Sequence, residues 1–153
     1  MGTTKETTAQ VASLSRSCHP ACIACGRPEH GGLGLRFREA SDASVVATFA
    51  CESRYQGYPN QLHGGIIATL LDAAMMHCLF ARGICGVTVN IEVQFRHPVR
   101  VDTQADVRAW LCEESPSYYV LRAEIVQDGT TRAVAEGVFA ESAPVKGRGG
   151  ESR

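Results

Sequence analysis

A chain of 153 residues, 44% hydrophobic and 20% charged, has the size and composition of one globular domain. Its formal net charge of −1 gives no general attraction to nucleic acid or to an anionic membrane surface. Asp72, His77 and Arg82 interrupt the longest apolar run, so no membrane span of about 20 residues is expected. The first residues lack the apolar stretch of a secretory signal. We therefore expect a cytoplasmic protein with no nucleic-acid partner and no membrane partner.

The N-terminal region joins a polar segment to a group of cysteines. Residues 1–17 are rich in Thr and Ser without sustained periodicity, which predicts a mobile tail. Cys18, Cys22 and Cys25 follow with the spacing C-x3-C-x2-C, and His30 lies shortly after them. These residue types bind zinc, but a second ligand pair is missing downstream. A compact turn without a metal is therefore the preferred interpretation.

The chain contains seven cysteines, an odd number. Because no export signal precedes them, we expect free thiols in a reducing compartment. Cys51, Cys78, Cys85 and Cys112 are interpreted as small hydrophobic residues in or near the core.

Two strands are predicted before the central helix. Leu33, Leu35 and Phe37 alternate with polar or small residues, which is typical of a half-buried strand over residues 33–38. Residues 44–50 are expected to pair with it as a hairpin. Residues 51–62 contain Gly, Pro and Asn and are predicted to form a loop.

A long helix is predicted over residues 63–82, with the sequence HGGIIATLLDAAMMHCLFAR. It is apolar on nearly every face and contains one carboxylate, Asp72. A helix that is hydrophobic all round must be covered by the rest of the protein, because no membrane segment is indicated. We therefore expect the other elements to surround it and Asp72 to be buried.

Four further strands are predicted after the helix, over residues 87–96, 102–112, 118–127 and 132–141. One apolar helix followed by antiparallel strands predicts an α+β domain in which a curved sheet wraps the helix. One sheet cannot cover a helix on every side, so a second copy is expected to contribute. The predicted domain spans residues 18–142, and residues 143–153 are expected to be a disordered tail.

Several motifs in this order resemble the hotdog-fold thioesterases of the phenylacetic-acid-degradation (PaaI-like) type. The matching residues are His63-Gly64-Gly65, the acid Asp72 nine positions after the histidine, the strand from Gly86 to Pro98, and Ala135 to Phe139. The resemblance covers about residues 33–141. It implies a hotdog fold, a curved antiparallel sheet wrapped around one long central helix, and a homodimer that assembles further into a tetramer.

The resemblance also implies roles for individual residues. The N–H of Gly64 would polarise a thioester carbonyl, and Asp72 of the partner subunit would act as general base or nucleophile. His63 would position the loop, and the Thr88 hydroxyl would help to place water or substrate. The remaining substrate-binding candidates are Gly65, Asn90, Phe95, Arg96, Pro98 and Arg100. No cofactor and no metal are implied, because coenzyme A would enter as part of the substrate.

Two departures from the family pattern leave alternatives open. Gly57 occupies the position where relatives carry an Asn that assists the thioester, and Asn60 lies three residues away. A turn that is basic in the human relative contains Glu113 and Glu114, so the acyl carrier could be coenzyme A or a carrier protein. The alternatives in other functional classes are a non-catalytic acyl-CoA binding or sensing module, a hotdog dehydratase or hydratase, and a zinc- or redox-responsive protein.

Overall fold

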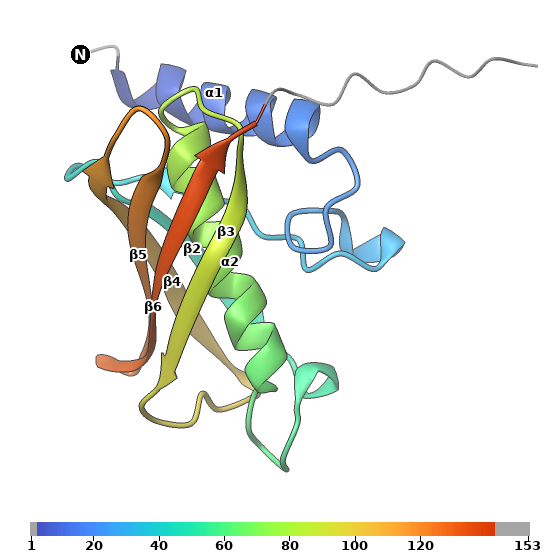
Figure 1. The fold of residues 1–153 in the computed structure, drawn as a ribbon. Coiled ribbons are helices and arrows are strands. Elements are labelled where there is room, and N and C mark those ends of the chain that lie inside the picture. The colour runs from blue at the N-terminus through green and yellow to red at the C-terminus, as the bar shows by residue number, and fades with distance from the viewer. Residues whose placement is uncertain (1–2, 143–153) are drawn as a thin grey trace, which may run out of the picture.

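A long helix, α2 (Gly64–Phe80), runs through the centre of the computed structural model, which describes residues 3–142 (Figure 1). From Leu70 to Phe80 every side chain except that of Asp72 is buried. The apolar sequence of this segment explains the arrangement, since each face must lie against another element to leave water. Within the described residues, no helix combines the length and the apolar character needed to cross a membrane.

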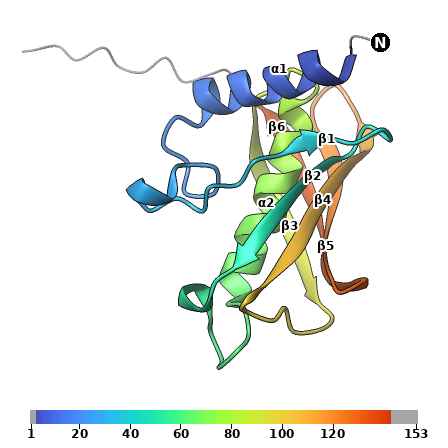
Figure 2. The same cartoon turned by 180° about the vertical axis from the view of Figure 1, so that it is seen from behind.

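The sheet that surrounds α2 has six antiparallel strands. They are β1 (Arg38–Glu39), β2 (Val45–Cys51), β3 (Gly86–Phe95), β4 (Thr103–Glu114), β5 (Tyr119–Gln127) and β6 (Thr130–Glu141). Their order across the sheet is β1-β2-β4-β5-β6-β3, and α2 packs against β2, β3, β4, β5 and β6 (Figures 1 and 2). This arrangement confirms the predicted hotdog fold.

Strand β3 forms one edge of the sheet and contains a bulge. Thr88 pairs with Phe139 and Asn90 pairs with the adjacent Val138, so Val89 is the extra residue in the bulged strand. The predicted alternation therefore changes phase at this point. Val89 is 63% exposed, although the pattern alone assigned it to the same face as the other apolar residues of the strand.

The N-terminal region forms a helix where the sequence pattern predicted a tail. Helix α1 (Thr3–Cys18) crosses the C-terminal end of α2 and also contacts β1 (Figure 2). Val11 is buried, and Leu14 and Cys18 pack against the core at helical spacing. The prediction was wrong because this short apolar stripe is hidden among Thr and Ser. Residues 143–153, predicted as a tail, lie outside the described residues.

The strand predicted over residues 33–38 was mostly wrong. Only Arg38 and Glu39 form a strand, β1. The preceding residues instead bond to the cysteine-rich turn, because Leu33 N–H donates to Ile23 O and Leu35 N–H donates to Ala24 O. Their alternating burial is nevertheless retained, since Leu35 and Phe37 are both buried.

The expectation of seven free thiols was also wrong. Cys18, at the end of α1, forms a disulfide with Cys85, which precedes β3, and their Cα atoms lie 6.5 Å apart. Cys51 and Cys78 are buried as predicted, and burial raises the pKa of each thiol to about 11. Cys112 is exposed, which corrects its assignment to the core. The cytoplasmic location stays a prediction.

Candidate active site

The N-terminal end of α2 is capped by His63. The backbone of His63 is extended (φ −61°, ψ 135°), and its Nδ1 atom accepts a 2.8 Å hydrogen bond from the N–H of Gly65. Within residues 3–142, no hydrogen-bond partner is found for the N–H of Gly64. The first N–H groups of a helix carry partial positive charge and seek acceptors outside the helix. The cap thus occupies the second glycine amide and leaves the first one available.

The space around Gly64 could accept a substrate group. A cavity of about 280 Å³ adjoins it, and the lining residues are Gly57, Tyr58, Gln61, Leu62, His63 and Gly64. A Cβ atom at Gly64 would lie 3.5 Å from the Phe95 ring, an ordinary contact, so packing within this chain does not require glycine there. Tyr58, which is 80% exposed, and Gln61 were missed by sequence reasoning, because the pattern identified their segment only as a loop.

Gly57, which stands where relatives carry an Asn, packs against the capping residue His63. A Cβ atom at this position would lie 3.2 Å from Cδ2 of His63 and 3.4 Å from its Cα. An Asn side chain at this position would therefore push the His63 ring in the present loop conformation. Asn60 lies at the turn of the same loop with φ +65°, and its backbone O accepts a hydrogen bond from Val101 N–H. The loop conformation thus gives a local reason for glycine at position 57.

Asp72 faces the sheet edge rather than the core. The Thr88 hydroxyl donates a 2.7 Å hydrogen bond to Oδ1 of Asp72, which joins β3 to α2. The prediction that Asp72 is buried was wrong for the single chain, because its side chain is only half-buried. One carboxylate oxygen is oriented by Thr88, and the partly open surroundings leave the carboxylate accessible.

Gly64 and Asp72 are too far apart to act on one carbonyl within one chain. Eight residues of α-helix separate them by about 12 Å along the axis, at 1.5 Å per residue. Reacting atoms must approach to about 3–3.5 Å. A site that uses both groups on one carbonyl therefore needs two copies of α2.

The predicted substrate-binding residues are divided between two faces of the sheet edge. Phe95 lies over Gly64, whereas Arg96 lines a cavity of about 330 Å³ whose walls include Glu92, Trp110 and Arg122. Successive side chains in a strand point to opposite faces, which explains the separation. Asn90, next to the bulge, is exposed.

Arg100 and Pro98 belong to the segment after β3, which packs beside the loop before α2. Gln61 and Arg100 form an antiparallel bridge, and Leu62 N–H donates to Val99 O. The Arg100 guanidinium is paired with Asp128. The Pro98 carbonyl accepts a hydrogen bond from Arg132. The structure thus brings the Arg100 backbone close to the helix N-terminus, but its charge is shared with an acid.

A second group of polar side chains lies at the other end of α2. One donor atom each from His19, Cys22 and Cys25 lies within 4.8 Å of the other two. Hydrogen bonding from Cys25, and then from His19, lowers the pKa of the Cys22 thiol to about 3. The same interaction with Cys22 raises the pKa of Cys25. Cys22 is therefore the more acidic of the two thiols in this group.

Comparison with known proteins agrees with this fold. The profile of a family described as the thioesterase superfamily matches residues 60–134, which contain α2, β3 and most of the following strands. Acyl-coenzyme A thioesterase THEM4 from Bos taurus is 28% identical over 120 residues, covering 75% of this chain and 49% of the relative. THEM4 from Rattus norvegicus is 32% identical over 71 residues, or 44% of this chain and 30% of the relative. The chain thus spans less than half the length of these two relatives.

Solved structures share the fold over most of the chain. The E. coli PaaI protein from the phenylacetic acid degradation operon gives a TM-score of 0.75 at 18% identity, covering 94% of this chain and 98% of that one. A hypothetical thioesterase protein from Streptococcus pneumoniae, solved with coenzyme A, gives a TM-score of 0.66 at 19% identity, covering 72% and 90%. The chain thus has the hotdog fold of these structures, and its residues 60–134 resemble the thioesterase superfamily, as the sequence motifs predicted.

Proposed function

We propose that this protein hydrolyses acyl-CoA thioesters to the free acid and coenzyme A. The observation that carries the proposal is the N–H of Gly64, which has no partner within the described residues and adjoins a cavity at the N-terminus of α2. A helix N-terminus offers fixed N–H donors to developing negative charge, and one such donor is worth about 3–4 kcal/mol of barrier. The acyl-CoA thioesterases among the relatives support the choice of substrate class.

In the proposed reaction, the Gly64 N–H donates to the thioester carbonyl oxygen. Asp72 of the partner subunit accepts a proton from water while the water oxygen attacks the carbonyl carbon. The resulting tetrahedral intermediate collapses with cleavage of the C–S bond, and the proton is returned to the departing thiolate. Direct attack by the Asp72 carboxylate, followed by hydrolysis of the anhydride, uses the same two groups. Either route is consistent with the separation of about 12 Å within one helix.

His63 is assigned a positioning role. Its Nδ1 atom already accepts the Gly65 N–H, which fixes the ring as a helix cap beside the cavity. A dehydratase or hydratase that used His63 as its base would need the ring to serve both purposes. Hydrolysis through Asp72 is therefore favoured over that alternative.

The partners proposed for this chain are an acyl-CoA and a second copy of itself. The acyl carrier is proposed to be coenzyme A, in line with the Streptococcus pneumoniae structure that contains it. Arg100 is paired with Asp128, so Arg96 is the better candidate for a phosphate contact. Arg96 forms no ion pair with another residue in the range 3–142.

The function is tested by measuring thiol release from a panel of aliphatic and aromatic acyl-CoAs. Because Cys112 is exposed and free, an enzyme-only baseline must be subtracted when a thiol reagent is used. Asp72→Asn should lower kcat by about 10²- to 10³-fold. The matched control is Asp106→Asn, since Asp106 also accepts a threonine hydroxyl, from Thr48 at 2.8 Å, but lies on β4. Equal turnover of wild type and Asp72→Asn would overturn the role of Asp72, and wild type inactive on every acyl-CoA would favour a binding module.

A further inference from the structure

The second polar group of the molecule lies at the opposite end of α2 from Gly64 and has no part in the proposed hydrolysis. His19 directly follows α1, and Cys22 and Cys25 lie in the turn after it. One donor atom of each side chain lies within 4.8 Å of the others. In a tetrahedral zinc site with Zn–S of about 2.3 Å and Zn–N of about 2.1 Å, donor atoms are roughly 3.4–3.8 Å apart. Small side-chain rotations would bring the three donor atoms from their present spacing to the spacing of a zinc site.

The turn is held by its backbone in a shape that presents both sulfur atoms. Gly26 N–H donates to Cys22 O at 2.7 Å, and Gly34 N–H donates to Gly26 O at 2.9 Å. A Cβ atom at Gly26 would lie 2.4 Å from Cys22 O, and one at Gly32 would lie 2.2 Å from Gly26 O, so this close approach requires glycine at both positions. The turn conformation is therefore fixed by the C-x-x-C-G sequence and its glycine-rich partner segment.

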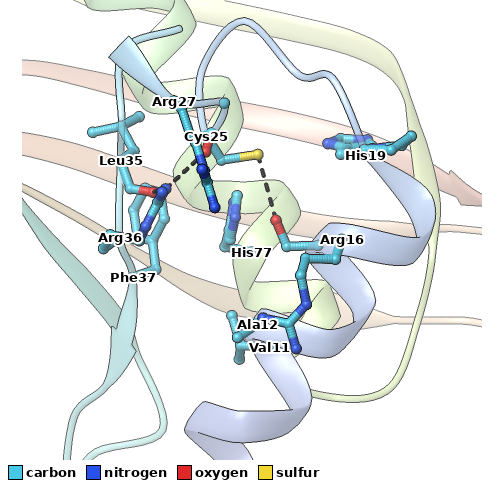
Figure 3. A pocket seen from close by; sticks show the side chains of 13 residues that line it. Val11, Ala12, Arg16, His19, Cys25, Arg27, Leu35, Arg36, Phe37 and His77 are labelled. Carbon is cyan, nitrogen blue, oxygen red and sulfur yellow. Dashed lines mark hydrogen bonds between the residues drawn. The ribbon is translucent and has the colours of Figure 1, made fainter. Parts of the chain in front are cut away.

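Both sulfur atoms of this turn accept a hydrogen bond, as metal-bound sulfur atoms often do. The N–H of Ala24 points at Cys22 Sγ at 3.4 Å, and the Ser15 hydroxyl donates to Cys25 Sγ at 3.4 Å. Hydrogen bonds to ligand sulfur orient it and stabilise its negative charge. Figure 3 shows the Cys25 sulfur directed toward α1, with the His19 ring near the end of that helix.

The histidine of this cluster has a ring nitrogen without a hydrogen-bond partner in the part of the chain that the structure describes. Nδ1 of His19 is buried and has no hydrogen-bond partner within residues 3–142. Its ring is fixed by an edge contact with Phe80 of α2, at 5.2 Å between ring centroids. Buried polar atoms in native proteins are almost always satisfied by protein, water or an ion. One ring nitrogen of His19 thus lacks a partner among the described residues, and a nitrogen of the same ring lies within 4.8 Å of both sulfur atoms, which indicates room for a shared ligand.

We propose that His19, Cys22 and Cys25 bind a zinc ion. The three protein ligands leave one tetrahedral position, which a water molecule fills from the adjoining cavity of about 470 Å³ (Figure 3). His19, Cys25 and the buried His77 all line this cavity. Cys18, which the sequence spacing placed in the same cluster, is not a ligand, because it forms the disulfide with Cys85.

The proposed zinc site joins three parts of the chain at the C-terminal half of α2. It links the end of α1 to the turn over residues 22–26, and through the His19–Phe80 contact it fixes both against the central helix. The disulfide beside it ties the same end of α1 to the residue before β3. We therefore assign the ion a structural role, in holding the N-terminal region on the hotdog domain.

The test is the metal content of the 153-residue chain, purified without a histidine tag and dialysed against metal-free buffer. Mass spectrometry of the metal should find about one zinc per chain. Cobalt(II) added to the zinc-free protein should produce the intense near-ultraviolet absorption of thiolate-to-cobalt charge transfer. Cys22→Ser and Cys25→Ser should each lose at least about nine-tenths of the zinc and this absorption. Cys112→Ser, which removes an exposed free thiol on β4, should retain both.

The thermal midpoint gives a readout that does not depend on activity. Chelation of zinc should lower the midpoint of the wild type and of Cys112→Ser but leave that of zinc-free Cys22→Ser unchanged. If the serine variants do not fold, the zinc content and the cobalt absorption of the wild type alone decide whether the site binds zinc. Zinc well below one per chain together with no thiolate–cobalt absorption would overturn the proposal. A Cys22–Cys25 disulfide in the freshly isolated protein would overturn it in favour of a redox-active pair.

Discussion

The Thr88 hydroxyl of β3 donates a 2.7 Å hydrogen bond to Oδ1 of Asp72 on α2. The bulge at Val89 makes this contact compatible with the rest of the strand. Before the bulge Thr88 faces α2, and after it Ile91 and Val93 pack against the core while Asn90 and Glu92 are exposed. A regular strand with Thr88 in this position would have turned Asn90 and Glu92 toward the helix. The bulge thus allows one strand to orient the proposed catalytic acid and to cover the core.

Removal of the Thr88 hydroxyl should impair catalysis with little effect on substrate binding. Thr88→Val keeps the side-chain shape but leaves Asp72 without its oriented donor, so kcat should fall about tenfold while KM changes little. Thr88→Ser should restore most of kcat. Thr48→Val, which removes the equivalent bond to Asp106, should behave as wild type. Steady-state kinetics on the best acyl-CoA checks this, and a wild-type kcat for Thr88→Val would refute the role of the bond.

Removal of the Gly64 N–H should abolish most activity without unfolding the helix. Proline lacks the N–H but is favoured at the first position of a helix, and the extended backbone of His63 suits the residue before a proline. Gly64→Pro should therefore lower kcat by about 10²- to 10³-fold.

Gly64→Ala is the matched variant because it retains the N–H and adds a Cβ with only an ordinary contact to Phe95. It should fold equally well and retain more activity than Gly64→Pro. Circular dichroism and thermal melts verify folding. If the two variants lose activity equally, steric access rather than the N–H donor is the function of Gly64.

A charge on the exposed edge strand should weaken self-association. Val87, Val89 and Phe95 on β3 are 50%, 63% and 58% exposed, on a strand with one unpaired edge. An apolar edge of this kind is suited to cover by another chain. Val89→Lys should raise the dissociation constant of the oligomer about tenfold or more, measured by light scattering across a concentration series. Tyr118→Lys, an exposed aromatic in the β4–β5 turn, is the control, and equal masses for wild type and Val89→Lys would exclude this edge as the interface.

The free energy of unfolding should fall in mild acid because of His77. Burial lowers the pKa of His77 to about 4, while an unfolded histidine has a pKa of about 6.5. Between these values the unfolded chain binds more protons, so this contribution is complete above about pH 6.5 and declines as the pH falls toward 4. The difference corresponds to about 3 kcal/mol.

His77→Phe, which suits the stacking against Phe37 and the edge contact with Phe80, should remove this part of the pH dependence. Urea unfolding of both proteins from pH 7 to pH 4 measures it, after chelation so that metal release does not contribute. Parallel curves for the two proteins would show that His77 is not responsible.

The parts of the fold that the sequence predicts well are those with long, regular patterns. Helix α2 is a long apolar run, and strands β3 to β6 are each nine residues or longer, so their type and approximate bounds could be assigned. Helix α1 has only Val11, Leu14 and Cys18 as a visible apolar stripe, and its neighbours obscure it. The Cys18–Cys85 disulfide joins residues 67 positions apart, which no local pattern reveals.

The sequence motif names candidate site residues but does not reveal how they are arranged. The motif located Gly64 and Asp72, yet their orientations depend on the His63 cap and on the bulge at Val89. Phe95 and Arg96 were both candidates for substrate binding, whereas strand geometry places them on opposite faces. The proximity of His19 to Cys22 and Cys25 could not be read from the spacing alone, because the direction of His19 depends on α1, which was not predicted.

The central claim is that each active site combines Gly64 of one subunit with Asp72 of the other. It is tested most directly by mixing two inactive variants, Gly64→Pro and Asp72→Asn, through co-expression and purification of the mixed dimer pool. A heterodimer contains one site with both groups intact, so a random pool should recover about a quarter of wild-type activity. If both groups acted from the same subunit, no heterodimer would contain an intact site, and activity no higher than that of the two variants alone would contradict the account.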